Sequence, residues 1–329
     1  MNPMDPYQEL TLYQRSSLLM AAAKLGAFAA LADGAATAEQ VASRIQGNLD
    51  ATTRLLEALR HLDYVAFNGG RYALNTFSSS FLRDGAGGMM RLAWKEHIFY
   101  EAWSRLAESV KEGKPQFPSY RKRIETDFPS VEKFLLALND LAQTAAPGLL
   151  ATGAFSGLAT LLDLGGGAAG YAAALAAALP STHVTLADLP EILPIARGHL
   201  ERKGLAGRVE LVTANLLADD CGLGDRTFDG VFLSHILHDF EPGVAAAIIA
   251  RAARRVKPGG KLVVLDVVIP AEAPRNPVEA LFDLMMLVEV PGGRTHPLVE
   301  VRRWMESSGL AGFRSHPLYF GSLLEARAA

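Results

Sequence analysis

LATLLDLGGGAAG, residues 158–170, is the stretch of this 329-residue chain that decides the fold. Its apolar first half predicts a buried strand, and the AAALAAALP that follows its glycines predicts a helix closed by Pro180. Glycines between a strand and a helix allow a tight turn and let the backbone approach a ligand closely. The spacing of Gly165, Gly167 and Gly170 also fits G-x-G-x-x-G, the pattern of dinucleotide-binding loops.

Strands and helices alternate downstream of this loop. The segments HVTLADLP, RVELVTANLL, FDGVFLSHIL and KPGGKLVVLDVVIP predict four more strands, separated by helices, and HPLYFGSLLEARA predicts closing strands at an antiparallel edge. This order predicts an α/β fold with a Rossmann-like, doubly wound parallel sheet. Such sheets bind ligands beyond the carboxyl ends of their strands, so the residues after each strand are the candidate site.

The first 90 residues predict a different, mainly helical module. Thr37 is a candidate N-cap for the helix AEQVASRI, and Asp50 for the helix ATTRLLEALRHLDYV. Two short β-prone runs flank Asn68-Gly69-Gly70, which is a strong hairpin signal. A helix, a turn, a helix and a hairpin in this order are typical of a winged helix.

Charge and composition narrow the functional classes. Residues 1–90 carry seven basic and eight acidic side chains, so they offer no basic face for DNA, and we interpret them as a structural or dimerising module. The net charge of −3 argues against a nucleic-acid partner for the whole chain, and the single Cys221 excludes an internal disulfide framework. We find no apolar run of roughly 18–20 residues and no basic signal-peptide region, which predicts a cytoplasmic protein with no membrane partner.

Residues 88–150 predict an all-helical segment. This segment is rich in aromatic residues, and Trp103 is a candidate wall residue of a pocket for an aromatic ligand, with ordinary core packing as the alternative. The stretch KEGKPQFPSYRKR combines charges with glycine and proline and predicts a solvated loop.

Asp163, just before the glycine loop, bears on the choice of ligand. A carboxylate there repels the phosphates of a dinucleotide, but it suits the ammonium or sulfonium group of S-adenosylmethionine. Asp188 ends the second predicted strand, where it can bind a ribose diol. Two alternatives stay open: Asp163 only caps a loop, or the chain is an NAD-linked oxidoreductase.

The ordered motifs LLDLGGGAAG, LADLP, VTANLL, LSHILHDF and KPGGKLVVLDVVIP resemble those of the class I S-adenosylmethionine-dependent O-methyltransferases that act on small molecules. These are the plant caffeate and flavonoid type and its bacterial relatives in natural-product pathways. The resemblance implies a winged-helix dimerisation domain (1–90), a helical middle segment lining the acceptor pocket (91–150) and a Rossmann-like cofactor domain (151–329). It also implies a homodimer, S-adenosylmethionine as cofactor and a small aromatic acceptor.

The resemblance assigns two groups of binding residues. Those implied for the cofactor are Asp163, Gly165, Gly167, Asp188, Leu189, Asn215, Leu216 and Ser234. Those considered for the acceptor are Trp103, Asp283, Met286 and Thr295. The chain departs from the family pattern at Asn215, where an aspartate is common, and at Ser234, where a lysine or arginine is frequent. An amide oxygen can still accept from the adenine amino group, whereas the serine lacks a charge for the cofactor carboxylate.

His238 matches the family's catalytic base, and Asp266 matches the carboxylate that orients this histidine. A histidine can take the proton of a phenol as the oxygen attacks the methyl group. The family commonly has a second acid whose place in GGRTHP falls near Thr295, and whether Thr295 or His296 replaces it stays open; a neutral side chain there would support the imidazolium less strongly.

Two further alternatives to O-methylation stay open. The same fold and cofactor also serve N- and C-methylation, decarboxylation, hydroxylation and cyclisation. The other alternative belongs to a different functional class, a winged-helix regulator that responds to a ligand. His235 lies three residues before His238, so a metal pair is conceivable, but no further ligand has a familiar spacing and we predict no metal site.

Overall fold

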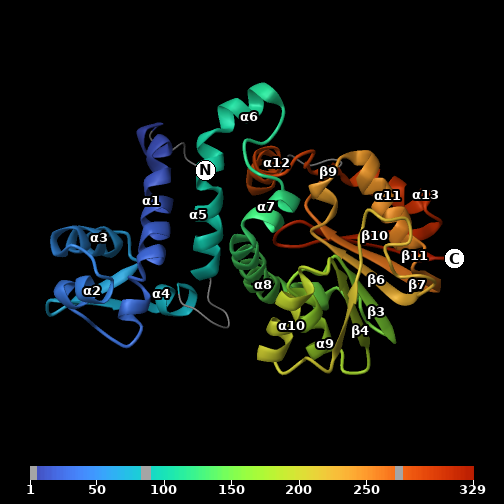
Figure 1. The fold of residues 1–329 in the computed structure, drawn as a ribbon, viewed down its shortest axis with the longest axis horizontal. Helices are drawn as coiled ribbons and strands as arrows, with labels where there is room; N and C mark the ends of the chain where they lie inside the picture. Colours follow the sequence, from blue (N-terminus) through green and yellow to red (C-terminus); the bar gives the residue numbers. More distant parts are fainter. Residues whose placement is uncertain (1–5, 83–89, 271–276) are drawn as a thin grey trace. The chain divides into compact units, whose positions relative to one another are not determined.

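The chain divides into two units, residues 1–99 and 100–329, with the boundary inside helix α5 (Met90–Ser104). Figure 1 shows the computed structural model, which describes residues 6–82, 90–270 and 277–329. Among these residues no helix is long and apolar enough to cross a membrane. The predicted cytoplasmic location and the predicted domain limits stay predictions.

The first unit has the element order predicted for a winged helix. Its elements are α1 (Pro6–Leu25), η1 (Ala29–Leu31), α2 (Ala38–Arg44), α3 (Leu49–His61), β1 (Val65–Asn68), β2 (Arg71–Leu74) and α4 (Thr76–Phe81). The predicted cap of α2 is confirmed, because Thr37 and Gln40 form a reciprocal capping box. The predicted hairpin is also confirmed, with Gly69 and Gly70 at φ values of 56° and 80°, which suit the tight turn.

The predicted cap of α3 is wrong by two residues. Asn48 has the extended backbone of an N-cap, and its side chain accepts a hydrogen bond from the backbone N–H of Ala51. Asp50 lies in the first turn instead, where it forms an ion pair of 2.9 Å with Arg54. Asparagine and aspartate are both good N-caps, so residue type alone does not separate them.

The second unit is built on a seven-stranded sheet with the order β10-β11-β7-β6-β3-β4-β5. The strands are β3 (Thr160–Leu164), β4 (His183–Asp188), β5 (Val209–Thr213), β6 (Phe228–Ser234), β7 (Val256–Asp266), β10 (Leu310–Pro317) and β11 (Ser322–Ala328). The five strands β3 to β7 run parallel, and β11 and β10 add the predicted antiparallel edge. A short parallel pair, β8 (Val268–Ile269) and β9 (His296–Pro297), lies apart from this sheet.

Helices cover both faces of the sheet (Figure 1). The helices of this unit after α5 are α6 (Leu106–Glu112), α7 (Tyr120–Thr126), α8 (Phe128–Ala151), α9 (Gly170–Ala178), α10 (Leu193–Arg202), α11 (Pro242–Ala253), α12 (Pro277–Glu289) and α13 (Leu298–Ser307). Alternate residues of β3 separate the two cores: Leu161 packs with α8, α9 and α10, and Leu162 packs with α11 and α13.

The prediction of a loop over KEGKPQFPSYRKR is only partly confirmed. Residues 113–119 connect α6 to α7, but the basic run at its end lies inside α7, which Ser119 caps through the backbone N–H of Lys122. Arg123 of this run is buried. Helices α7 and α8 form a small core with residues of the glycine loop and of the segment after β4, including Ala168 and Ile192.

Candidate active site

The strand order brings the predicted functional residues to one edge of the sheet. β3 lies between β4 and β6, so the sequence order of the strands reverses on its two sides. A crevice at such a reversal is the usual ligand site of open α/β sheets. Asp188, Ser234 and Asp266 end their strands at this edge, and Asp163 is the next-to-last residue of β3.

The glycine loop is held by the carboxylate of Asp188. Its two oxygens accept hydrogen bonds of 2.7 Å from the backbone N–H groups of Gly167 and Leu189. Gly165 has φ +80°, and a Cβ there would lie 2.7 Å from Ile236 and 3.2 Å from Leu216. The structure therefore places Leu216, predicted as an adenine neighbour, against the first glycine of the loop.

Asn139 is a buried residue of α8 that binds the glycine loop, and the sequence analysis did not assign it. Its side-chain amide donates a hydrogen bond of 2.8 Å to the backbone carbonyl of Ala168. A Cβ at Gly170 would lie 2.7 Å from the Asn139 side-chain oxygen and 2.8 Å from Cβ of Ala142. The third glycine thus serves the close packing of α8 on α9. No signal in the sequence pairs Asn139 with a loop some thirty residues away.

Asp163 is fully buried, no side chain among the described residues donates a hydrogen bond to its carboxyl oxygens, and the backbone N–H of Ala172 is only a weak donor to it. Burial, with a smaller effect of the nearby Asp188 carboxylate, raises the pKa of Asp163 to about 7. A buried carboxyl in this state is costly unless a ligand brings donors or positive charge. The site therefore fits a group such as the ammonium of S-adenosylmethionine.

The two departures from the family pattern lie at strand ends. Asn215 follows β5, is exposed, and accepts a hydrogen bond of 3.0 Å from the backbone N–H of Leu217 through its side-chain oxygen. Ser234 is the half-buried last residue of β6. The next residue, His235, has φ +55°, a left-handed backbone that is uncommon outside glycine.

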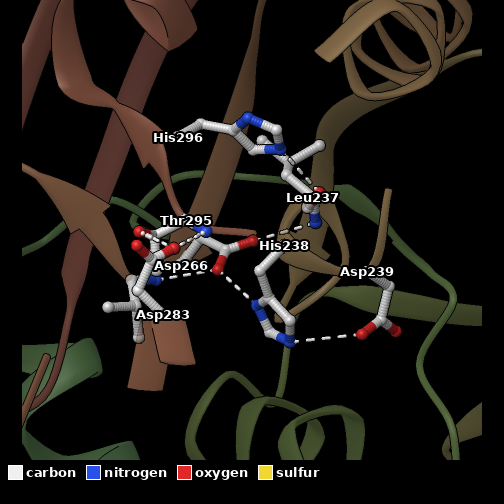
Figure 2. A network of polar contacts seen from close by, with 8 residues as sticks. Leu237, His238, Asp239, Asp266, Asp283, Thr295 and His296 are labelled. Atoms are coloured by element: carbon white, nitrogen blue, oxygen red, sulfur yellow. Dashed lines mark hydrogen bonds and ion pairs between the residues drawn. The ribbon is translucent and has the colours of Figure 1, made fainter. Parts of the chain in front are cut away.

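His238 and Asp266 form the closest polar pair of the site (Figure 2). Nδ1 of His238, on the short helix η2 (Leu237–Asp239), lies 2.6 Å from Oδ1 of Asp266. The backbone N–H groups of Val267 and Leu237 donate to the two Asp266 oxygens at 2.7 and 2.9 Å. Asp266 is thereby fixed, and the Nε2 atom of His238 takes no part in this pair.

Charges around this pair favour the imidazolium. Burial alone would lower the pKa of His238, but the charge and hydrogen bond of Asp266, together with Asp239 and Glu289, outweigh it and raise the pKa to about 9. Burial alone would raise the pKa of Asp266, but His238 holds it below its usual range. Both pKa shifts therefore have the same cause, which is the attraction between the His238 imidazolium and the Asp266 carboxylate.

Asp239 is a second acid beside His238 that the sequence analysis did not assign. Its Oδ1 lies 3.6 Å from Nε2 of His238, on the side of the ring opposite Asp266, as Figure 2 shows. Its side chain is 44% exposed, whereas that of Asp266 is 2% exposed. The two carboxylates therefore differ: that of Asp266 is buried and fixed, and that of Asp239 is partly exposed.

Aromatic rings pack against His238 and His235. The ring of Phe282 on α12 meets that of His238 edge to face at 4.9 Å, and Phe320 meets Phe282 at 5.4 Å. His235 stacks between Tyr171 and Phe320, with centroid distances of 6.3 and 6.5 Å. Flat apolar walls of this kind suit an aromatic ligand.

His235 also belongs to the one cluster of potential metal ligands among the described residues. Ligand atoms of His235, His238 and Asp266 lie within 4.8 Å of one another. The close bond between His238 and Asp266 already occupies one atom of each. Burial lowers the pKa of His235 to about 4, so this ring is neutral at ordinary pH.

Thr295, at the place of the family's second acid, is bound to Asp283 of α12. Its backbone N–H and its hydroxyl donate to Oδ1 of Asp283 at 2.8 and 2.7 Å. Met286 is buried on the same helix, and His296 lies within hydrogen-bond distance of the Leu237 carbonyl, at 2.9 Å. Trp103 is half-buried on α5. The acceptor roles of these residues stay predictions.

Both units match domains of known O-methyltransferases. Residues 103–314 match the O-methyltransferase domain, and residues 8–84 match the O-methyltransferase dimerisation domain, which implies a homodimer. A mitomycin biosynthesis 6-O-methyltransferase of Streptomyces lavendulae is 31% identical over 310 residues, 91% of this chain and 84% of that protein. The N,N-dimethyltransferase OxyT of Streptomyces rimosus is 29% identical over 272 residues, 79% of this chain and 76% of that protein.

A solved structure shares the whole fold. Human N-acetylserotonin methyltransferase, in complex with S-adenosylmethionine, superposes with a TM-score of 0.89 at 22% identity and covers 100% of this chain and 99% of that one. The O-methyltransferase domain match covers well over half of the chain. The chain therefore belongs to the S-adenosylmethionine-dependent O-methyltransferase family.

Proposed function

We propose that this methyltransferase acts on a hydroxyl group of a small phenolic or enolic molecule in specialised metabolism, with His238 as general base. The observation that supports this most is the 2.6 Å contact of His238 Nδ1 with buried Asp266, which leaves Nε2 for the proton of the acceptor. The same pair of groups, a base and the carboxylate that orients it, is how histidine bases are commonly held. The mitomycin relative, named a biosynthetic O-methyltransferase, supports the substrate class.

Residues of the glycine loop and the neighbouring strand ends would hold the cofactor. Buried Asp163 would bind its ammonium group, Asp188 its ribose hydroxyls, and Leu216 and Asn215 would lie beside its adenine. When bound, S-adenosylmethionine supplies a methyl group that a positively charged sulfur already activates. The protein then has to place the acceptor oxygen and remove its proton.

Nε2 of His238 would take the hydroxyl proton as the acceptor oxygen attacks. The hydroxyl proton goes to Nε2, the acceptor oxygen bonds the methyl carbon as the methyl–sulfur bond breaks and its electron pair stays on sulfur, and the imidazolium stays paired with Asp266. Nε2 lies 3.6 Å from the Asp239 carboxylate. Asp239 therefore stabilises the protonated base, and the acceptor hydroxyl has to reach Nε2 beside it.

Release of S-adenosylhomocysteine, measured by mass spectrometry, tests the reaction. The protein is incubated with S-adenosylmethionine and a panel of phenols and hydroxyquinones, and the methylated products are identified by fragmentation. We expect methyl ethers. Turnover confined to amines or carbon acids would reject O-methylation.

N-methylation is the second candidate. A relative that covers most of the chain is named an N,N-dimethyltransferase. The open carboxylate of Asp239 beside the base is compatible with an amine, which is attracted to it when protonated. Arylamines matched to the phenols of the panel separate the two reactions by product mass and fragmentation.

The charge of Asp239 predicts a pH effect. In the wild-type protein, kcat/KM for the acceptor should rise with pH as His238, with a pKa of about 9, loses its proton. Asp239→Asn removes a partly exposed negative charge from Nε2, so the imidazolium is stabilised less and its pKa falls. We expect the rising limb to move down by about 0.5–1 pH unit, in line with a partly exposed ion pair.

Asp219→Asn is the matched control, because Asp219 is fully exposed and pairs with Arg251, outside the active-site network described above. Its pH profile should overlay that of the wild-type protein. A limb that moves upward in Asp239→Asn, or stays in place, would contradict the role given to Asp239.

A further inference from the structure

The backbone of the glycine loop is strained at Ala169. This residue, the N-cap of α9, has φ +68°, in the left-handed region that glycine adopts readily and alanine does not. Ala169 is fully buried, and as an alanine it has no polar side-chain group to cap the helix. An alanine keeps such a conformation only when surrounding groups hold it there.

The peptide group between Ala168 and Ala169 is held at both ends. Its carbonyl, from Ala168, accepts a hydrogen bond of 2.8 Å from the side-chain amide of Asn139. Its N–H, from Ala169, donates to the carbonyl of Gly166 at 3.1 Å. The orientation of this planar group sets φ of Ala169, because φ is the rotation about the bond between the peptide nitrogen and Cα. Asn139 therefore binds the group whose rotation would release the strain.

Asn139 disfavours the relaxed arrangement of the loop. If the peptide group turned over, Ala169 would reach a negative φ, but the Ala168 carbonyl would lose its donor from Asn139. Asn139 is only 3% exposed, so its amide would then be buried without this acceptor, which costs free energy. The side chain of Asn139 thus stabilises the strained arrangement against the relaxed one.

The strained arrangement bears on cofactor binding because it sets the shape of the loop. The backbone N–H of Gly167, two residues before Ala169, is held by Asp188 at 2.7 Å, and Ala169 leads into the first turn of α9. Backbone groups of such a loop and helix start are those that contact a ligand in this fold. A ligand that binds one arrangement only loses affinity in proportion to the protein that adopts the other.

We propose that Asn139 is a positioning residue for S-adenosylmethionine, which keeps the glycine loop in the binding arrangement by opposing the strain at Ala169. The affinity for the cofactor therefore depends on a side chain of α8 that acts through the loop. This inference rests on the proposed function, because it takes the cofactor to lie against the glycine loop.

Calorimetric titration with S-adenosylhomocysteine tests the inference in a double-mutant cycle. Asn139→Ala removes the donor, so Kd should rise about tenfold, in the range of one buried hydrogen bond. Ala169→Gly alone should leave Kd within about twofold, because the wild-type loop already holds the binding arrangement. Adding Ala169→Gly to Asn139→Ala should return Kd to within about threefold of the wild-type value, because glycine adopts positive and negative φ about equally well.

Gln143→Ala is the matched control. Gln143 lies one turn further along α8, where its amide donates to the Asn139 backbone carbonyl at 3.3 Å and accepts from Lys203 at 2.8 Å. Both partners lie outside the loop, so this variant should bind within about twofold of the wild-type protein. An unchanged Kd in Asn139→Ala would overturn the inference. So would a raised Kd that Ala169→Gly does not lower, because Asn139 would then act only by packing α8 against α9.

Asp163→Asn, titrated in parallel, separates this inference from the proposed cofactor site. A Kd that rises in Asp163→Asn but not in Asn139→Ala would keep the site and reject the role of Asn139. A Kd that changes in neither variant would reject the proposed placement of the cofactor as well.

Discussion

Replacing His238 with alanine should lower kcat by about 10²- to 10⁴-fold, the usual contribution of a general base. The variant keeps Asp266, the glycine loop and Asp163, so the affinity for S-adenosylhomocysteine should change less than about threefold. The residual rate should rise with pH, because hydroxide then removes the proton that Nε2 takes in the wild-type enzyme. Single-turnover rates across pH 6–10, with product measured by mass spectrometry, check the expectation.

His183→Ala is the control for this variant. His183 begins β4, its side chain is 62% exposed, and it lies 3.5 Å from Glu210, a residue outside the candidate site. Its kcat should equal that of the wild-type protein. A His238→Ala variant with more than about a third of the wild-type rate would show that placing the acceptor is sufficient, and it would remove His238 from the role of base.

Asp163→Asn should weaken cofactor binding while it stabilises the protein. The variant loses a charged partner for the cofactor ammonium, so the Kd of S-adenosylmethionine should rise about 10- to 100-fold. The free protein gains, because a fully buried carboxyl with a pKa of about 7 no longer has to ionise. Calorimetric titration and thermal unfolding measure the two effects.

The raised pKa of Asp163 also predicts how the free energy of unfolding changes with pH. Asp163 has a higher pKa in the folded protein than in the unfolded chain, so between about pH 4 and pH 7 the folded state holds the extra proton and the free energy of unfolding falls as pH rises. The loss, up to roughly 4 kcal/mol, should be absent from Asp163→Asn. An unchanged Kd, or parallel stability curves for the two proteins, would contradict the role of Asp163.

The strands and the glycine loop are predictable because they depend on local pattern. An apolar run followed by Gly165, Gly167 and Gly170 predicts a strand, a turn and a helix from neighbouring residues alone. The pairing of His238 with Asp266 joins residues 28 apart, and it was reached only through the resemblance of ordered motifs. The boundary of α3 was missed because Asn48 and Asp50 are both good caps, and only the backbone angles decide between them.

The contacts that could not be predicted from the sequence are those between residues on different helices, strands or loops. Asn139 sits in a helix and binds a carbonyl 29 residues further along the chain. Arg123 belongs to a run of three basic residues, which is typical of a wet surface, and its burial depends on rings from three places. Asp239 follows His238 directly, yet its adjacency alone does not tell whether its carboxylate turns toward Nε2 of His238.

The strand-order reversal at β3 has a consequence for changing this enzyme in the laboratory. Asp163, Asp188 and Asp266 are anchored on central strands that both cores share, whereas Phe282 and Phe320 come from α12 and the turn between β10 and β11. Diversity confined to those two peripheral segments should change the preferred acceptor without disturbing the residues on the central strands. The central strands can thus be kept unchanged while the peripheral segments are varied, which suits directed evolution toward new acceptors.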